Sequence, residues 1–548
     1  MGTEPNLKIN WPALPSAVRV EAEKIVTDLL RKTQDSELIL ESILSLGRSR
    51  EKELADPVAD GAVYTPYPVA EKLVNHTNLQ AGQSVCDPAM GAGVFLIAAA
   101  EKRFHLGQSI ESIAKQTAGA DIDAVSVEVA KLSMQLWSWL RGTTGVSFDG
   151  LVCADPLINP PTNWVKSFDV IVGNPPFLSQ LKSRTTRHKN RSQKLKQRYG
   201  KLATQYVDES ALFLLASLDM VKKKGTICLI VPTSIFGAAS ARPIRERIDE
   251  VMPMTGLWVG GRDVFTDAKV DVLAPILSTE QKPLVHVYFQ KSEMCPTEVK
   301  RENNGSWGAI LADALGVPTL DAAIEKDLQR EATVTADFRD AYYWLSERVE
   351  ENGFQTHRKK IGKLATVGLI DPLTFKHGKK EVRFAKKKYS EPVVVAEHNP
   401  PNDFSEWLKR RRVPKILVAT QTKVIECVVD EIGDLIPSTP LIIIQPMNPN
   451  NIWHLASALS SPVGAAWAAS EAAGTGLGAN TVRLRASQLN LFPLPATSPE
   501  WDRAADLAQS IQTQGGSEKT FRDFGLVINS AYGIEDDDLL QWWINRLP

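Results

Sequence analysis

The sequence predicts an α/β protein built on a doubly wound, mostly parallel sheet, with a helical N-terminal subdomain and a mixed α+β C-terminal domain. Short apolar runs alternate with helical stretches between residues 63 and 290, which is typical of a parallel sheet covered on both faces. Past residue 352, strand-like runs are punctuated by Pro and Gly. At 548 residues, the chain is long enough for about three to five domains or subdomains.

The N-terminal sixty residues predict two amphipathic helices. Apolar residues recur at three- and four-residue spacing from Val18 to Leu30, and a second run of this kind extends from Leu38 to Leu46. The sheet strands expected next are Ser84 to Asp87, Thr117 to Ile122, Leu151 to Ala154, Phe168 to Gly173, Thr226 to Val231 and Leu284 to Phe289.

The remainder of the chain predicts a helical connector and a second domain. Residues 321–351 read as helical, and strands are expected at Val393 to Ala396, Ile416 to Thr420 and Leu441 to Ile444. The last fifty residues combine helix signals with the acidic run Glu535 to Asp538, which predicts a solvated tail. The predicted domains are therefore 1–60, 61–295, 296–350, 351–497 and 498–548.

Composition excludes several classes of protein. The 63 Lys and Arg nearly cancel the 64 Asp and Glu, so any affinity for nucleic acid must be local. Five widely separated cysteines argue against a disulfide framework or a cysteine-based zinc site, and no metal site is expected. The sequence shows neither a signal peptide nor a membrane-spanning run, so we expect a cytoplasmic protein with no membrane partner.

A glycine turn after the first expected strand predicts a ligand pocket. Asp87 ends the strand, and Gly91 and Gly93 precede a helix. Leu96 stands where a dinucleotide-binding turn needs its third Gly, so a pyrophosphate is disfavoured. A carboxylate at this place suits an ammonium group, as in the methionine half of S-adenosylmethionine. The alternative is an ordinary turn.

Two further acids close the next two strands. Asp121 is placed to accept hydrogen bonds from ribose hydroxyls, and Asp155 from an adenine exocyclic amine. A single Asp at a strand end is usually a turn residue, but three in succession favour one shared pocket.

The fourth strand runs directly into Asn174-Pro175-Pro176-Phe177. The two prolines fix an extended turn without N–H donors, and Asn174 adds a side-chain carbonyl. These acceptors can hold both hydrogens of a planar amino group, so that its nitrogen can attack a sulfonium methyl. Phe177 offers a face on which the base can stack. Such chemistry depends on positioning and charge placement. A plain proline turn is the alternative.

Together these motifs resemble the N6-adenine-specific DNA methyltransferases, in the subgroup where the cofactor motif precedes the catalytic motif and a target-recognition domain follows. The resemblance covers about residues 63–290 and, more loosely, the region to residue 495. It implies a Rossmann-like class I methyltransferase sheet, S-adenosylmethionine as cofactor, catalysis by Asn174 to Phe177, and a role in restriction-modification or epigenetic marking. Met90 and Ala92 depart from the family's usual Cys and Ser.

The resemblance also implies roles for individual residues. Thr65 lies in the motif that approaches the methionine carboxylate, and Phe265 would stack on the target base opposite Phe177. Phe213 either stacks on adenosine or belongs to the core. The expected cofactor-binding set is Thr65, Asp87, Ala89, Gly91, Gly93, Asp121, Ile122, Asp155 and Phe213.

Basic residues cluster beside the catalytic loop in residues 179–201, and this segment contains no acid. Phosphate contacts by such residues make DNA binding strongly dependent on salt; the alternative is a solvated face. Further basic clusters lie in residues 358–388 and 409–412, where a recognition domain is expected. The expected DNA contacts are Lys182, Arg184, Arg187, Lys189, Arg191, Lys194 and Arg411.

The sequence therefore predicts a site-specific enzyme that methylates N6 of adenine in double-stranded DNA after flipping the base, with a separate restriction endonuclease as a possible partner. Two alternatives stay open. One is transfer to another planar amine, such as N4 of cytosine, a guanine in RNA or a glutamine side chain. The other is a catalytically silent DNA-binding specificity subunit.

Overall fold

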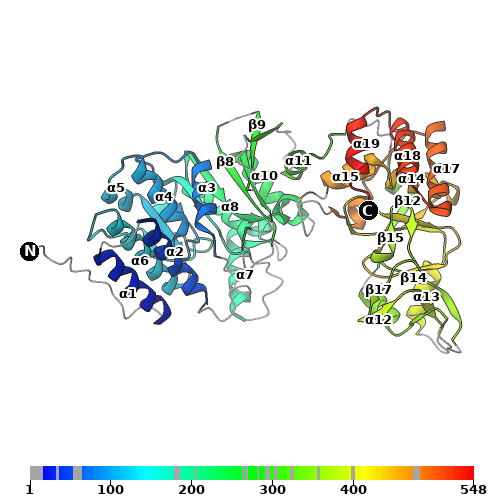
Figure 1. The fold of residues 1–548 in the computed structure, drawn as a ribbon, viewed down its shortest axis with the longest axis horizontal. Coiled ribbons are helices and arrows are strands. Elements are labelled where there is room, and N and C mark those ends of the chain that lie inside the picture. Colours follow the sequence, from blue (N-terminus) through cyan, green and yellow to red (C-terminus); the bar gives the residue numbers. More distant parts are fainter. Residues whose placement is uncertain are drawn as a thin grey trace, which may run out of the picture. The chain divides into compact units, whose positions relative to one another are not determined.

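The structure is a computed structural model that describes residues 16–31, 36–52, 64–177, 186–203, 207–261, 264–265, 270–280, 283–290, 296–300, 307–320, 326–337, 339–353, 358–396, 401–471, 473 and 482–548. The chain divides into two compact units, residues 1–310 and residues 311–548 (Figure 1).

The first unit is organised around one mixed sheet, in which ten strands are described. Its order is β10-β9-β7-β8-β5-β4-β1-β2-β3, with β6 paired to β8. The strands are β1 (Val85–Asp87), β2 (Thr117–Asp121), β3 (Leu151–Cys153), β4 (Phe168–Gly173), β5 (Val221–Leu229), β6 (Val231–Pro232), β7 (Met254–Gly261), β8 (Val272–Ser278), β9 (Leu284–Phe289) and β10 (Thr297–Lys300).

Strands β1 to β5 are parallel, whereas β8 runs antiparallel to both β5 and β7. The predicted doubly wound α/β sheet is confirmed, with an antiparallel insertion beyond β5. The strand order reverses at β1, which lies between β2 and β4. Open α/β sheets bind ligands in the crevice that forms at this reversal, beside the carboxyl ends of the strands.

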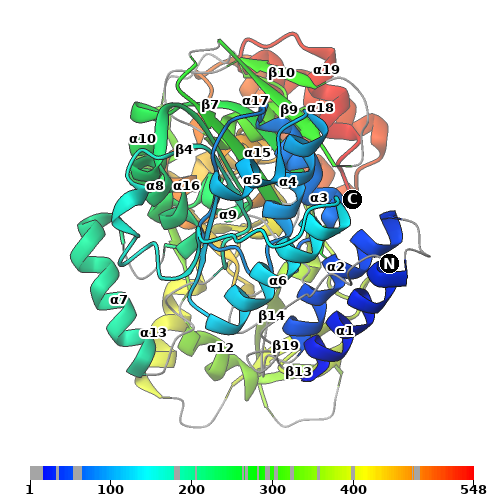
Figure 2. The same ribbon diagram turned by 90° about the vertical axis from the view of Figure 1, so that its left-hand side faces the viewer.

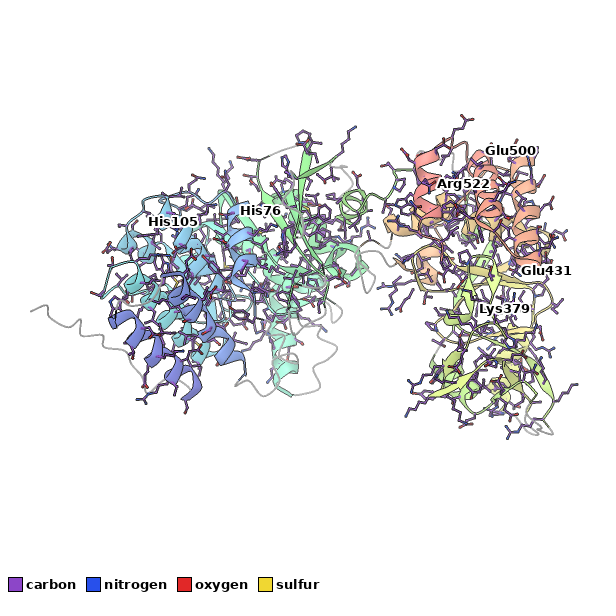
Figure 3. The ribbon with its side chains drawn as sticks, viewed as in Figure 1. His76, His105, Lys379, Glu431, Glu500 and Arg522 are labelled. Atoms are coloured by element: carbon purple, nitrogen blue, oxygen red, sulfur yellow. The ribbon has the colours of Figure 1, made fainter. Side chains whose placement is uncertain are left out.

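Helices connect these strands and pack on the sheet. They are α3 (Tyr67–His76), α4 (Val94–His105), α5 (Ile110–Lys115), α6 (Ala124–Leu140), α7 (Thr186–Tyr199), α8 (Glu209–Met220), α9 (Ser234–Gly237), α10 (Arg242–Val251) and α11 (Trp307–Ala314). Helix α3 packs on α4, and His76 near its end, labelled in Figure 3, stacks on Tyr288 of β9 with 3.9 Å between ring centroids.

The two N-terminal helices, α1 (Ser16–Arg31) and α2 (Ser36–Lys52), form where the amphipathic spacing predicts them. Their apolar faces do not form a separate core, because Val18, Ile25 and Ile43 are buried in one cluster with Trp137 of α6. Figure 2 shows α1 and α2 beside α6. The helical lead is therefore part of the first unit.

The second unit contains two four-stranded sheets, of orders β12-β24-β20-β22 and β13-β19-β14-β23. Their strands are β12 (Ala332–Ala336), β13 (Val349–Glu351), β14 (Lys360–Ala365), β19 (Pro392–Val395), β20 (Lys415–Val418), β22 (Cys427–Asp430), β23 (Leu435–Pro437) and β24 (Ile442–Pro446). Four strand pairs complete the unit: β11 (Lys326–Asp327) with β26 (Pro493–Leu494), β15 (Ile370–Asp371) with β16 (Thr374–Phe375), β17 (Val382–Phe384) with β18 (Lys387–Tyr389), and β21 (Gln421–Thr422) with β25 (Val482–Arg483).

The helices of the second unit are α12 (Arg339–Ser346), α13 (Asn402–Arg411), α14 (Ile452–Leu459), α15 (Pro462–Glu471), α16 (Ala486–Leu489), α17 (Pro499–Gln514), α18 (Glu518–Ala531) and α19 (Asp537–Ile544). The last three are core elements rather than a tail. Trp501, Phe524 and Trp543 are buried in one cluster with residues of β20, β22 and α14. The acidic run lies at the surface, where Asp536 caps α19.

The helical connector predicted for residues 321–351 is wrong. Within the described part of that segment, β12 pairs with β24, and only residues 339–346 form an α-helix, beside a short 3-10 turn at Leu328–Arg330. The alternation of Ala, Thr and Val in residues 332–336 favours a strand, because β-branched side chains fit a half-buried pleated surface.

Among the described helices, none is long and apolar enough to cross a lipid bilayer. The described residues also contain no group of three or more His, Cys, Asp or Glu side chains arranged to hold a metal ion.

Candidate active site

Three acids lie at neighbouring strand ends, as the sequence predicts. Asp87 ends β1, Asp121 ends β2, and Asp155 follows β3 by two residues. Because β3, β2 and β1 are adjacent and parallel, their carboxyl ends share one edge of the sheet.

Asp87 is almost completely buried, with 1% of its surface exposed. The Ala89 N–H donates to its Oδ1 at 3.0 Å, and no cationic side chain of the described residues forms an ion pair with it. Burial raises the pKa of Asp87 to about 8; the charge of Asp121 also raises the pKa, and the Ala89 hydrogen bond lowers it. A buried carboxyl group without a cation fits a ligand that supplies one.

The glycine loop is held against the end of β2 by the side-chain carboxylate of Asp121. Gly91 and Gly93 have φ values of 51° and 89°, which side-chain-bearing residues rarely adopt. The Gly91 N–H donates to Asp121 Oδ2 at 3.0 Å, and the Asp123 N–H donates to Asp121 Oδ1 at 2.8 Å. The loop conformation and the Asp121 carboxylate therefore fix each other, which brings backbone close to the pocket edge.

The two hydrophobic residues assigned to the adenosine differ in exposure. Ile122 is 67% exposed at the end of β2, so an apolar face is available there. Phe213 is 4% exposed in α8, a helix whose residues are all buried except Asp219. The structure thus brings Ile122 to the pocket edge and places Phe213 within the core.

The catalytic loop leaves β4 directly beside Asp87. A Cβ atom on Gly173 would lie 2.4 Å from Asp87 Oδ1, so the absence of a side chain at Gly173 permits the close approach. The Asn174 Nδ2 donates to Thr65 Oγ1 at 3.0 Å, and Thr65 is buried. This bond directs the amide nitrogen towards Thr65 and places the amide oxygen on the opposite edge of the side chain.

Phe177 and Phe265 lie in contact, although 88 positions separate them in the sequence. Their ring centroids are 6.4 Å apart and the planes are inclined by 58°. Phe265 is 4% exposed, whereas Phe177 is partly exposed. The structure therefore brings together the two rings that the sequence assigned to opposite faces of one target base.

The residues assigned to DNA contact fall into several groups. Lys182 and Arg184 lie outside the described residues, as do the side chains of Arg187 and Lys189. Lys194 is exposed on α7. Arg191 and Arg411 instead form ion pairs within their own units.

The guanidinium of Arg191 contacts Asp155 and also pairs with Glu209, with 2.9 Å between Nη2 and Oε2. In the second unit, Arg411 Nη2 lies 2.7 Å from Oδ1 of the buried Asp337. A DNA contact by either arginine would compete with these carboxylates. The contacts of Arg191 have no local sequence signal, because both acids lie outside the basic run.

A sequence model of N-6 DNA methylases matches residues 54–304, which contain the whole glycine loop, the three acids and the catalytic loop. This segment is similar to the N-6 DNA methylase family. The match confirms the predicted family resemblance and covers the sheet of the first unit.

Relatives of known function share modest identity with this segment. A type I restriction enzyme methylase subunit (EcoEI) of Escherichia coli is 24% identical over 234 residues, which are 42% of this chain and 44% of that protein. The type II methyltransferase M.VspI of Vibrio sp. (strain 343) is 25% identical over 189 residues, which are 34% of this chain and 40% of that protein. The chain thus spans less than half the length of these relatives.

Two solved structures share the fold over most of the chain. The type IIL restriction-modification enzyme MmeI, solved in complex with DNA, matches with a TM-score of 0.63 at 12% identity. The matched region covers 92% of this chain and 80% of the MmeI chain. The DrdV–DNA complex has a TM-score of 0.52 at 11% identity and covers 89% of this chain and 61% of that one. At these identities the likeness concerns the fold.

Proposed function

We propose that this chain transfers a methyl group from S-adenosylmethionine to N6 of adenine in double-stranded DNA, after the target base has been rotated out of the duplex. The observation that carries the proposal is the position of the Asn174 to Phe177 loop directly beside Asp87 at the reversal of strand order. A loop built to hold a planar amine adjoins a pocket that suits a cationic cofactor. Similarity to the N-6 DNA methylase family supports adenine as the target.

The cofactor would be held by the acids and the glycine loop. S-adenosylmethionine supplies an electrophilic sulfonium methyl group. Asp87 would face the ammonium group, Asp121 the ribose hydroxyls and Asp155 the adenine amine, with the exposed Ile122 against the adenine plane. The proposed set also includes Thr65, Ala89, Gly91 and Gly93. The positive φ of the two glycines is a conformation that suits residues without a side chain, so the loop backbone can approach the cofactor closely.

The catalytic loop would hold the target amine by accepting its two hydrogens. The Asn174 amide oxygen and the Pro175 carbonyl are the proposed acceptors. Thr65 orients the first, and the Pro175-Pro176 turn fixes the direction of the second. Localising the nitrogen lone pair in this way prepares it for attack, so the main contributions are orientation and preorganised dipoles. Phe177 and Phe265 would separate to admit the base between them.

DNA would contact exposed basic side chains in both units. In the first unit these are Lys194 and Lys196 on α7. In the second unit, exposed lysines gather around the β17–β18 hairpin, including Lys379 (Figure 3), Lys380, Lys386 and Lys387. Each phosphate contact releases counterions, so affinity should decrease steeply as salt increases. A separate restriction endonuclease is a further proposed partner, by analogy with the names of the relatives.

The test is transfer of tritiated methyl groups to unmethylated genomic DNA. We expect incorporation with wild type and a loss of about 100-fold or more with Asn174→Ala, because this variant removes one acceptor of the target amine. Lys300→Ala, at the exposed edge strand β10, serves as the matched surface control. Equal incorporation by wild type and Asn174→Ala would refute the proposal. Mass spectrometry of the nucleosides distinguishes N6-methyladenine from N4-methylcytosine, and a parallel reaction with RNA tests the remaining amine substrates.

A further inference from the structure

Helix α7 has one face directed towards the acid at the end of β3. Arg191 has 21% of its side chain exposed and contacts Asp155, which is 19% exposed, and Glu209, which is 7% exposed. Its Nε lies 3.2 Å from both carboxylate oxygens of Glu209, and its Nη2 lies 2.9 Å from Oε2. A planar guanidinium can serve two carboxylates at once, which an ammonium group cannot do with the same geometry.

A second arginine on the same face fixes the segment that follows Asp155. Arg198 Nη1 donates to the carbonyl oxygens of Pro156 at 3.2 Å and Leu157 at 3.1 Å. Leu195, one turn before Arg198, is completely buried. The spacing of Arg191, Leu195 and Arg198 puts all three on one face of the helix.

The acids held by Arg191 belong to two different segments of the first unit. Asp155 follows β3, and its Oδ1 accepts a hydrogen bond from the Leu157 N–H at 3.1 Å. Glu209 is the first residue of α8, immediately after the capping residue Asp208. Arg191 therefore ties the segment after β3 to the start of α8, and it balances two carboxylates that would otherwise repel each other at short range.

Two exposed lysines lie on α7 outside this inner face, on its two flanks. Lys194 and Lys196 are exposed, and neither forms an ion pair with any residue that the structure describes. Figures 1 and 2 show α7 apart from α1 and α2 in both views. One helix thus carries an inner face on the cofactor side and, on its flanks, exposed lysines whose charge is complementary to phosphate.

We propose that Arg191 is a positioning residue that holds Asp155 for the adenosine of the cofactor, and that it couples DNA binding at the exposed lysines of α7 to cofactor affinity. This inference rests on the proposed function. DNA that binds Lys194 and Lys196 stabilises α7 in its docked position. Because Arg191 lies on α7 and holds Asp155, this stabilisation also fixes the position of Asp155. Coupling of this kind is reciprocal, so the cofactor also strengthens DNA binding.

The first experiment measures the affinity of the full chain for S-adenosylmethionine by calorimetry without DNA. We expect Arg191→Gln to weaken binding about fivefold or more, because Asp155 and Glu209 lose their shared cation. Arg191→Lys should restore part of the affinity, since it keeps the charge without the fork. The matched control is Arg247→Gln on α10, which breaks an exposed pair with Glu250 of 3.1 Å. This control should retain wild-type affinity.

A double-mutant cycle tests whether Arg191 acts through Asp155. If it does, adding Arg191→Gln to Asp155→Asn should cause much less further loss than Arg191→Gln causes in the wild type. In methyl transfer, the KM for the cofactor should rise while kcat at saturating cofactor stays within about twofold. Fully additive losses, or a fall in kcat alone, would overturn the inference. Thermal unfolding of each variant shows whether it is folded. If Arg191→Gln is not folded, the same measurements on Arg191→Lys decide the test.

The coupling is tested by repeating the calorimetry with sheared, unmethylated genomic DNA. We expect DNA to tighten cofactor binding in the wild type and in Arg247→Gln, and to lose this effect in Arg191→Gln. An equal gain in all three proteins would refute the coupling. Absence of cofactor binding by the wild type would instead refute the proposed function, so the two failures are distinguishable.

Discussion

The buried carboxyl group of Asp87 should make the first unit less stable as the pH rises towards 8. The pKa of this carboxyl is about 8 in the folded chain, against an ordinary value of 3.8. Between these values the folded state holds a proton that the unfolded state has lost. The free energy of unfolding therefore decreases as the pH rises, and the contribution of Asp87 is fully present only below about pH 4.

The magnitude follows from this difference in pKa. One group changes the free energy of unfolding by at most about 1.4 kcal/mol per pH unit. Between pH 5.5 and 8, Asp87 should therefore cost the wild type about 2–3 kcal/mol. Asp87→Asn is nearly isosteric, carries no charge and keeps an oxygen that can accept from the Ala89 N–H. It should already be more stable than the wild type at pH 5.5, and the difference should grow by about 2–3 kcal/mol between pH 5.5 and 8.

The assay is urea unfolding of wild type and Asp87→Asn at several pH values from 5.5 to 8.5, following the transition of the first unit. The difference between the two proteins cancels the other titrating groups. Asp169→Asn is the matched control, because Lys222 and Ser84 hold the pKa of Asp169 below its ordinary value. The effect of that control should be constant over this pH range. A constant difference between wild type and Asp87→Asn would refute the argument.

The same carboxyl group gives a signature of cofactor binding. A cation placed beside Asp87 lowers its pKa, so binding near pH 7 should release a proton from the wild type. Calorimetry in two buffers with different ionisation enthalpies measures this release. Asp87→Asn should bind without it, and equal proton release by both proteins would show that Asp87 does not face the cation.

Two further substitutions test packing. Gly173→Ala should weaken cofactor binding about tenfold or more, because its Cβ would lie 2.4 Å from Asp87 Oδ1 and displace the carboxyl group or the end of β4; wild-type affinity in this variant would contradict the geometry. Lys415→Met should destabilise the second unit by about 3–5 kcal/mol, because it leaves the buried Asp430 without its cation. Urea unfolding should show much of this loss recovered in Lys415→Met/Asp430→Asn, which removes the unpaired charge and keeps an acceptor for the Asp434 and Leu435 N–H groups. An equally unstable double variant would refute the role of the ion pair.

The sequence predicted strands β1 to β4 more completely than the rest of the sheet. Strands β1 to β4 are short apolar runs that each end near an acid or the Asn174 loop, so pattern and chemistry agree there. Strands β7 and β8 escaped prediction because both are buried along nearly their whole length and show no alternation. Pro275 within β8 further weakens the strand pattern.

The sequence could not predict the ion-pair partners of the arginines, for a different reason. Arg191 lies in an acid-free run, yet its acids come from positions 155 and 209. Arg411 likewise pairs with Asp337, 74 positions away. A charge run shows where basic residues are concentrated, but the fold decides which of them remain free for DNA. This is why Lys194 is a stronger candidate for a phosphate contact than Arg191.

The three acids at the strand ends look equivalent in the sequence, and the structure separates them by their partners. Asp155 already has the guanidinium of Arg191, so it can add a neutral donor but has little need of a cation. Asp121 accepts two backbone N–H groups, which fix its oxygens for hydroxyl donors. Asp87 is the most buried of the three and forms no ion pair with a described side chain. Charge balance therefore favours Asp87 as the partner of the cationic end of the proposed cofactor, with the uncharged groups of that cofactor towards the other two acids.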